Sequence, residues 1–105
     1  MAGNLPRLQN IKLDPFLESY APSYIENRKK DFVTLQGLLN KKKFKQIEKL
    51  SHKIAGSAGT YGFQNLSLIG NQLEDAAHNR SFEKIEVFLH AGIEYLDGMK
   101  FQKAQ

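Results

Sequence analysis

The stretch LSHKIAGSAGTYGF, residues 50–63, decides the fold prediction, because it combines a helical pattern with one histidine set apart from that pattern. Apolar and small residues recur there, and just before it, at three- and four-residue steps: Phe44, Ile47, Ser51, Ile54, Ala55 and Ala58. This spacing predicts a helix from about Lys43 to Thr60. At about 100° per residue, His52 lies well off the apolar stripe, so we expect its side chain to face solvent.

Gly56 lies four residues after His52 and therefore on the same helix face. A glycine inside a helix costs roughly 1 kcal/mol relative to alanine, so its presence calls for a reason. The missing side chain leaves room beside the imidazole for a bulky group, and Ser57 follows with a hydroxyl and a backbone N–H. The pattern indicates a histidine that is kept clear for covalent modification.

Working outward, the segment before this stretch predicts one long helix and one short one. Ser23-Tyr24-Ile25-Glu26 fits a capping box and predicts a helix start, and a stripe of Ile25, Phe32, Leu35 and Leu39 carries that helix to about Asn40. Asp14-Pro15 predicts a short helix upstream, which Ala21-Pro22 would end. Residues 1–13 show no sustained periodicity, and we expect them to be loosely ordered.

Two more helical stripes follow the central stretch. The first consists of Phe63, Leu66, Ile69, Gly70, Leu73, Ala76 and Ala77; after an N-cap at Ser81, the second consists of Phe82, Ile85, Leu89, Gly92, Leu96 and Met99. Short connections make consecutive helices antiparallel neighbours. The sequence therefore predicts an all-α fold, an up-down-up-down antiparallel four-helix bundle with an additional short N-terminal helix, as a single domain over residues 1–105.

Composition limits the possible functions. The chain has no cysteine and no histidine pair at helical metal-ligand spacing, so we expect neither a disulfide nor a metal site. No apolar run approaches the roughly 20 residues of a membrane span, and we expect a cytoplasmic monomer. The net charge of +4 is compatible with nucleic acid or with an acidic protein surface. The lysine run Lys41 to Lys43 lacks an aromatic or arginine-rich readout element, so we expect a solvated loop and no nucleic-acid binding.

The residues around His52 resemble a known family. The histidine-containing phosphotransfer (HPt) domain of multistep phosphorelays has a histidine followed by Gly-Ser, then a further glycine, a leucine and a Leu-Glu or Leu-Gln pair. The matching residues here are His52, Gly56, Ser57, Gly62, Leu66 and Leu73-Glu74. The family's frequent lysine three residues after the histidine is Ala55 in this chain.

The resemblance implies that His52 accepts a phosphoryl group from a receiver-domain aspartate and passes it to another receiver. It also implies that Nε2 carries the phosphoryl group while an acceptor, for which Glu74 is the candidate, holds Nδ1. The expected partners are receiver domains of response regulators, a hybrid sensor kinase, or both. The aspartate and Mg²⁺ would belong to the receiver, so this chain would be a carrier without a cofactor and without kinase activity of its own.

Three lysines are candidates for offsetting the phosphoryl charge or for meeting an acidic receiver surface. Lys45 and Lys49 share the His52 face, whereas Lys53 points roughly 100° away from it. We interpret the remaining histidines, His78 and His90, as ordinary surface or helix-end residues.

Two alternatives stay open at this point. The chain could be a basic helical interaction module that is not phosphorylated and that binds through Lys41 to Lys45, or the HPt domain of a larger hybrid kinase or response regulator.

Overall fold

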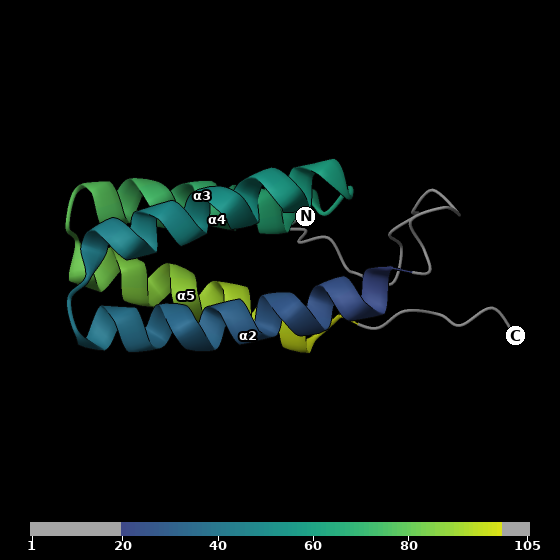
Figure 1. Cartoon of the computed structure of the whole chain (residues 1–105), viewed down its shortest axis with the longest axis horizontal. Helices are drawn as coiled ribbons and strands as arrows, with labels where there is room; N and C mark the ends of the chain where they lie inside the picture. Colours follow the sequence, from purple (N-terminus) through teal and green to yellow (C-terminus); the bar gives the residue numbers. More distant parts are fainter. Residues whose placement is uncertain (1–19, 100–105) are drawn as a thin grey trace, which may run out of the picture.

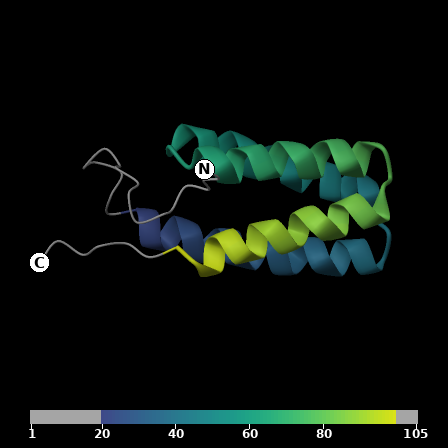
Figure 2. The same cartoon turned by 180° about the vertical axis from the view of Figure 1, so that it is seen from behind.

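The computed structural model describes residues 20–99, which form four α-helices and no strand. The helices are α2 (Ala21–Asn40), α3 (Phe44–Thr60), α4 (Gln64–His78) and α5 (Phe82–Asp97). Figures 1 and 2 show them as an antiparallel bundle in which each helix reverses the direction of the one before it. The predicted four-helix bundle is thereby confirmed. The segment 1–13 and the short helix expected from Asp14 lie outside the described residues.

The start of α2 differs from the prediction. The helix begins at Ala21 after Tyr20 as its N-cap, and Pro22 occupies its first turn. No side chain caps this end, and Ser23 lies inside the helix, so the predicted capping box was wrong. The physical reason is that proline has no backbone N–H, a loss without cost in the first turn of a helix, where N–H groups have no partner within the helix. Its fixed φ also suits a helix start. Pro22 therefore opens α2, although the sequence analysis assigned it to the end of an earlier helix.

The predicted apolar stripes form the core. The buried residues include Phe32 on α2 and Gly92 on α5, and these two residues face each other. A Cβ atom at position 92 would collide with the Phe32 ring, so the glycine allows α5 to approach α2. The other large side chains that are fully buried are Leu35, Leu39, Ile47, Ile54, Phe63, Leu66, Leu73, Ile85, Leu89 and Leu96.

Helices α3 and α4 make the most extensive contact of any pair in the bundle. Small residues cause this close approach. A Cβ atom at Gly70 would lie 2.8 Å from the backbone nitrogen of Ala55 and 3.0 Å from its Cα atom. The Ser67 hydroxyl donates a hydrogen bond of 2.8 Å to the Ala55 carbonyl oxygen, which joins the two helices at the same level. The backbones of α3 and α4 are therefore in direct contact around Ala55.

All three connections between helices have the same geometry. In each, the last of three linking residues donates its N–H to the carbonyl five residues back, and the middle residue donates its N–H to the carbonyl three residues back. The bonds over five residues are Lys43–Leu38, Phe63–Ala58 and Ser81–Ala76, and those over three residues are Lys42–Leu39, Gly62–Gly59 and Arg80–Ala77. This is the Schellman arrangement, which satisfies carbonyl groups at a helix end. It places the middle residue at positive φ: 55° for Lys42, 89° for Gly62 and 55° for Arg80. Only Gly62 adopts this conformation without the usual steric penalty.

The last residue of each connection is also the N-cap of the next helix. At α5 the Ser81 hydroxyl accepts a hydrogen bond from the Lys84 N–H, as the sequence predicted. A link of only three residues makes consecutive helices antiparallel neighbours, which explains the order of the bundle.

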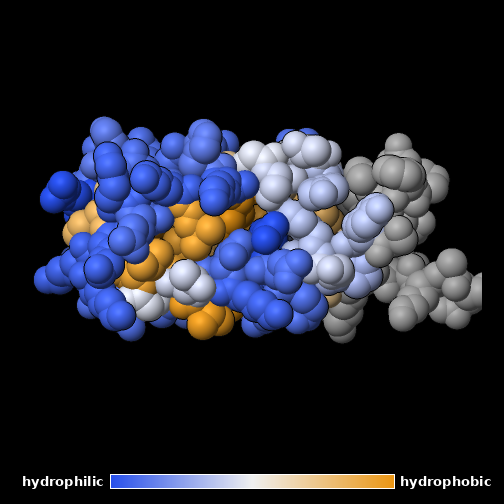
Figure 3. Space-filling model, in the orientation of Figure 1, coloured by the Kyte–Doolittle hydropathy of each residue, from blue (hydrophilic) through white to orange (hydrophobic). Residues whose placement is uncertain are grey.

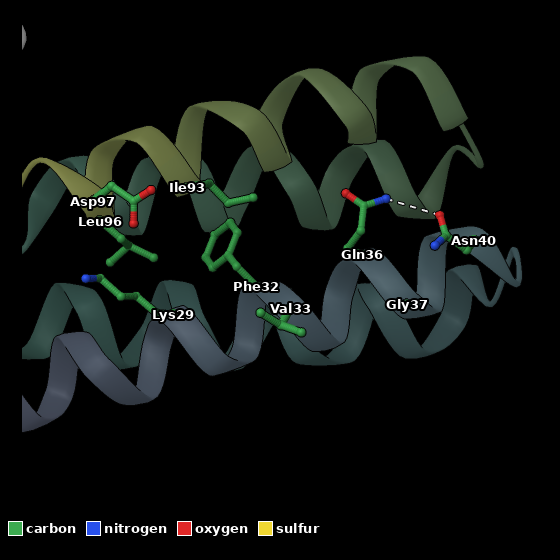
Figure 4. Close-up of a pocket in the computed structure, with 9 residues that line it drawn as sticks. All are labelled: Lys29, Phe32, Val33, Gln36, Gly37, Asn40, Ile93, Leu96 and Asp97. Atoms are coloured by element: carbon green, nitrogen blue, oxygen red, sulfur yellow. Dashed lines mark hydrogen bonds between the residues drawn. The ribbon is translucent and has the colours of Figure 1, made fainter.

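An apolar groove of about 510 Å³ lies between α2 and α5. Figure 4 shows Phe32 between the two helices, with Lys29 and Asp97 at one end of the groove and Gln36 hydrogen-bonded to Asn40 at the other. On the face seen in Figure 3, a band of hydrophobic residues lies between hydrophilic ones in the part nearest the α2–α3 connection, whereas the part where α2 begins is mostly of intermediate hydropathy. None of the four helices has the length and hydropathy that crossing a membrane requires.

Candidate functional site

His52 projects from the middle of α3 into solvent, with 74% of its side chain exposed. Its Nδ1 atom lies 3.1 Å from Oε2 and 3.2 Å from Oε1 of Glu74 on α4. A carboxylate only accepts hydrogen bonds, so Nδ1 carries a proton and donates it. In the neutral ring the lone pair then resides on Nε2, which has no hydrogen-bond partner among the described residues. The site thus presents one oriented, nucleophilic nitrogen to solvent.

The close packing of α3 on α4 brings the two side chains together. Ala55 lies about one turn after His52, and Gly70 lies about one turn before Glu74. Because the helices are antiparallel and touch at Ala55 and Gly70, His52 and Glu74 fall opposite each other one turn further along. Glu74 is 31% exposed, so its carboxylate is partly shielded while still reaching the ring. A carboxylate in this place fixes the orientation of the imidazole ring.

Gly56 leaves open space beside the histidine. A Cβ atom built at this position would have no neighbour within 4 Å, and the residue is exposed. Packing therefore does not require a glycine at this position, although glycine lowers the stability of the helix relative to alanine. The open space lies on the His52 face, where an incoming group would approach the ring.

Ser57 forms hydrogen bonds within the bundle, and none of them is to His52. Its Oγ atom lies 2.7 Å from the Tyr24 hydroxyl and donates to the Ile54 carbonyl oxygen at 3.3 Å. Tyr24 is buried, stacks on Phe63 at 5.5 Å between ring centroids, and is tilted against Tyr61 at 4.9 Å. These rings close the end of the bundle and hold the first turn of α2 against the last turns of α3. Sequence reasoning did not identify Tyr24, because its position at the start of α2 was misassigned.

Arg28 on α2 is only partly exposed, and an aromatic ring and an acidic side chain accommodate its charge. The guanidinium carbon lies 4.6 Å from the Tyr24 ring centroid, and Nε lies 2.8 Å from Oδ2 of Asp31. Nearby, burial, with a smaller contribution from Tyr24, raises the pKa of Tyr95 to about 12, so this phenol stays neutral at physiological pH.

The three candidate lysines, Lys45, Lys49 and Lys53, are exposed and form no ion pair within residues 20–99. Ala55, which stands where the family has a lysine, is only 6% exposed and packs against Gly70. The positive charge near His52 therefore comes from the α3 lysines and not from position 55.

The structure also shows a pair that sequence reasoning missed. His78, the last residue of α4, is 70% exposed, and its Nδ1 lies 3.2 Å from Oε2 of Glu48 on α3, which is 25% exposed. The sequence does carry a signal for this second pair, because α3 and α4 each have a glutamate four residues before a histidine: Glu48 before His52, and Glu74 before His78. His90 on α5 is exposed and has no such carboxylate partner in the described part of the chain.

No three histidine or acidic side chains within residues 20–99 come together as metal ligands. The chemistry available at the site is that of a lone imidazole oriented by a carboxylate.

Taken together, the four-helix bundle and the exposed, carboxylate-oriented histidine form an arrangement suited to carrying a group on the imidazole. The Hpt domain family model matches residues 22–99, and the chain belongs to this family. Membership implies a phosphotransfer function in phosphorelays, by way of a phosphohistidine, and interaction with receiver domains. Hpt domains are phosphocarrier modules rather than enzymes. No curated protein and no solved structure was found to match the chain.

Proposed function

We propose that His52 is the phosphoryl acceptor, which takes the group from the aspartyl phosphate of one receiver domain and passes it to the aspartate of another. The observation that carries this proposal is the geometry of the ring. Nδ1 is held by Glu74, while Nε2 is free and exposed beside the open space at Gly56.

The transfer step follows from that geometry. The Nε2 lone pair attacks phosphorus, the bond from phosphorus to the aspartyl oxygen breaks, and the receiver carboxylate leaves. The ring becomes a phosphorylated imidazolium whose Nδ1 proton is shared with Glu74, so the carboxylate stabilises the positive charge that develops. Catalysis of phosphoryl transfer consists almost entirely of positioning and electrostatic stabilisation. The receiver domain would supply the Mg²⁺ and most of the stabilisation of the phosphoryl charge. The reverse attack by a second aspartate completes the relay.

Incubating the chain with a panel of phosphorylated receiver domains, while following radiolabel, tests this proposal directly. Label should move to the chain within minutes from at least one receiver, and a second, unphosphorylated receiver should then remove it. A chain that gains no label from any receiver would contradict the proposal.

The open space at Gly56 gives a steric prediction. Replacing Gly56 with leucine should lower the transfer rate at least tenfold, because the new side chain occupies the approach to His52. The thermal midpoint should hold or rise, since leucine has the higher helix propensity. Gly37→Leu is the matched control: Gly37 also has open space around it, but it lies on α2, away from His52. Equal transfer rates for the two variants would show that Gly56 serves another purpose.

Charge near His52 gives a prediction that depends on salt. Changing Lys45 and Lys49 together to glutamine should slow transfer several-fold at low ionic strength by weakening association, with little effect on stability. The defect should shrink as salt is added, because the Debye length falls to about 8 Å at physiological ionic strength. The control is the double variant Lys30→Gln/Lys84→Gln, which removes the same charge from exposed positions on α2 and α5. A defect that does not vary with salt would exclude an electrostatic role for the two α3 lysines.

A further inference from the structure

A second imidazole–carboxylate pair lies one helical turn from the first. In the first pair His52 of α3 donates to Glu74 of α4, and in the second His78 of α4 donates to Glu48 of α3. The Nδ1–Oε2 distances are 3.1 and 3.2 Å. The phosphotransfer chemistry described above uses only the first pair, which leaves the second without an assigned role.

Glu48 occupies a sensitive position. It precedes His52 by four residues, so the two side chains are neighbours on one face of α3. A carboxylate left free there could turn along the helix toward the imidazole. It would then place a negative charge beside an anionic phosphoryl group, which opposes the transfer. In the structure Glu48 instead reaches across to α4 and contacts His78.

The other charged groups around Glu48 do not hold it in this position. Lys45 and Lys49 lie nearby on α3, yet neither forms an ion pair with it. On α4, Asp75 is acidic and so cannot form an ion pair with Glu48, while Glu74 is engaged by His52. Among the described residues, the His78 imidazole is the only group with a hydrogen bond or ion pair to the Glu48 carboxylate.

We propose that His78 is a positioning residue for phosphotransfer, which acts by holding the Glu48 carboxylate on the α4 side and away from the phosphoryl group at His52. This inference rests on the proposed function of His52. It assigns to His78 no contact with the phosphoryl group and no transfer step of its own.

A second-site rescue experiment tests the inference with a phosphorylated receiver that labels the wild-type chain. His78→Ala should lower the transfer rate about fivefold, the size expected for one unit charge about 4 Å from the phosphoryl group with the screening of bulk water. Adding Glu48→Gln to that variant should restore the wild-type rate, because the released side chain no longer carries a charge. His90→Ala, which removes an exposed histidine on α5, is the control and should transfer at the wild-type rate.

Rescue is the decisive readout, because a merely structural role of His78 would not be repaired by a second substitution at Glu48. A His78→Ala rate equal to wild type, or a loss that Glu48→Gln does not restore, would overturn the inference and leave the role of His52 intact. Failure of the wild-type chain to accept label from any receiver would instead overturn the proposed function, and the inference with it.

Discussion

Replacing His52 with glutamine is expected to reduce labelling by a phosphorylated receiver to background. Glutamine is polar and close in size, but its side-chain amide has no nucleophilic nitrogen, because the nitrogen lone pair is delocalised into the carbonyl. In the wild-type chain the label should be acid-labile and alkali-stable, as a phosphoramidate is. Because 74% of the His52 side chain is exposed, the substitution should leave the helical circular dichroism spectrum and the thermal midpoint nearly unchanged.

His90→Gln is the matched control for this experiment, since it replaces another exposed histidine by the same residue on a different helix. It should be labelled as fast as the wild-type chain. Undiminished labelling of the His52→Gln variant would show that another residue accepts the phosphoryl group.

The largest effect on stability is expected at Gly70. Replacing it with alanine would place a Cβ atom 2.8 Å from the backbone nitrogen of Ala55, and a backbone cannot rotate out of the way as a side chain can. Helices α3 and α4 would have to separate, which typically costs about 1–3 kcal/mol in a well-packed core. For a domain near 100 residues, each kcal/mol lowers the thermal midpoint by roughly 4–8 °C. Urea unfolding should show a lower midpoint concentration with little change in slope.

The same substitution at Gly37 is the control. No atom lies within 4 Å of a Cβ atom there, so Gly37→Ala should gain up to about 1 kcal/mol of helix propensity without a steric cost. The two variants should therefore move the free energy of unfolding in opposite directions. Equal stabilities would mean that α3 and α4 adjust more easily than their contact at Ala55 implies. A separated pair should also transfer phosphate more slowly, because the His52–Glu74 contact depends on the same close approach.

The sequence predicted the helices well because their apolar residues repeat clearly. The predicted helix from about Lys43 to Thr60 agrees with α3 to within one residue, and the buried face follows the expected stripe. The start of α2 was wrong because Ala21-Pro22 is compatible with both a helix end and a helix start, and local pattern does not separate the two.

The site was predictable only in part, for a different physical reason. Exposure of His52 follows from its angle on one helix, so the sequence suffices. The contacts between helices depend on their relative register, which a stripe does not specify. Glu74 was proposed from a family resemblance, and the Glu48–His78 pair was missed for lack of one. The Tyr24–Ser57 contact was also missed, because it joins residues 33 positions apart on two different helices.

The three matching connections between helices have a consequence for the rate of folding. Each link closes a loop of only a few residues, so bringing neighbouring helices together costs little chain entropy. Helices adjacent in sequence are adjacent in space, and the non-local packing needed to complete the bundle is mainly that of α2 against α5. Contacts that are this local belong to the class of topologies that fold in microseconds to milliseconds. The chain should consequently reach its native bundle quickly, with α3 and α4 able to pair before the two outer helices meet.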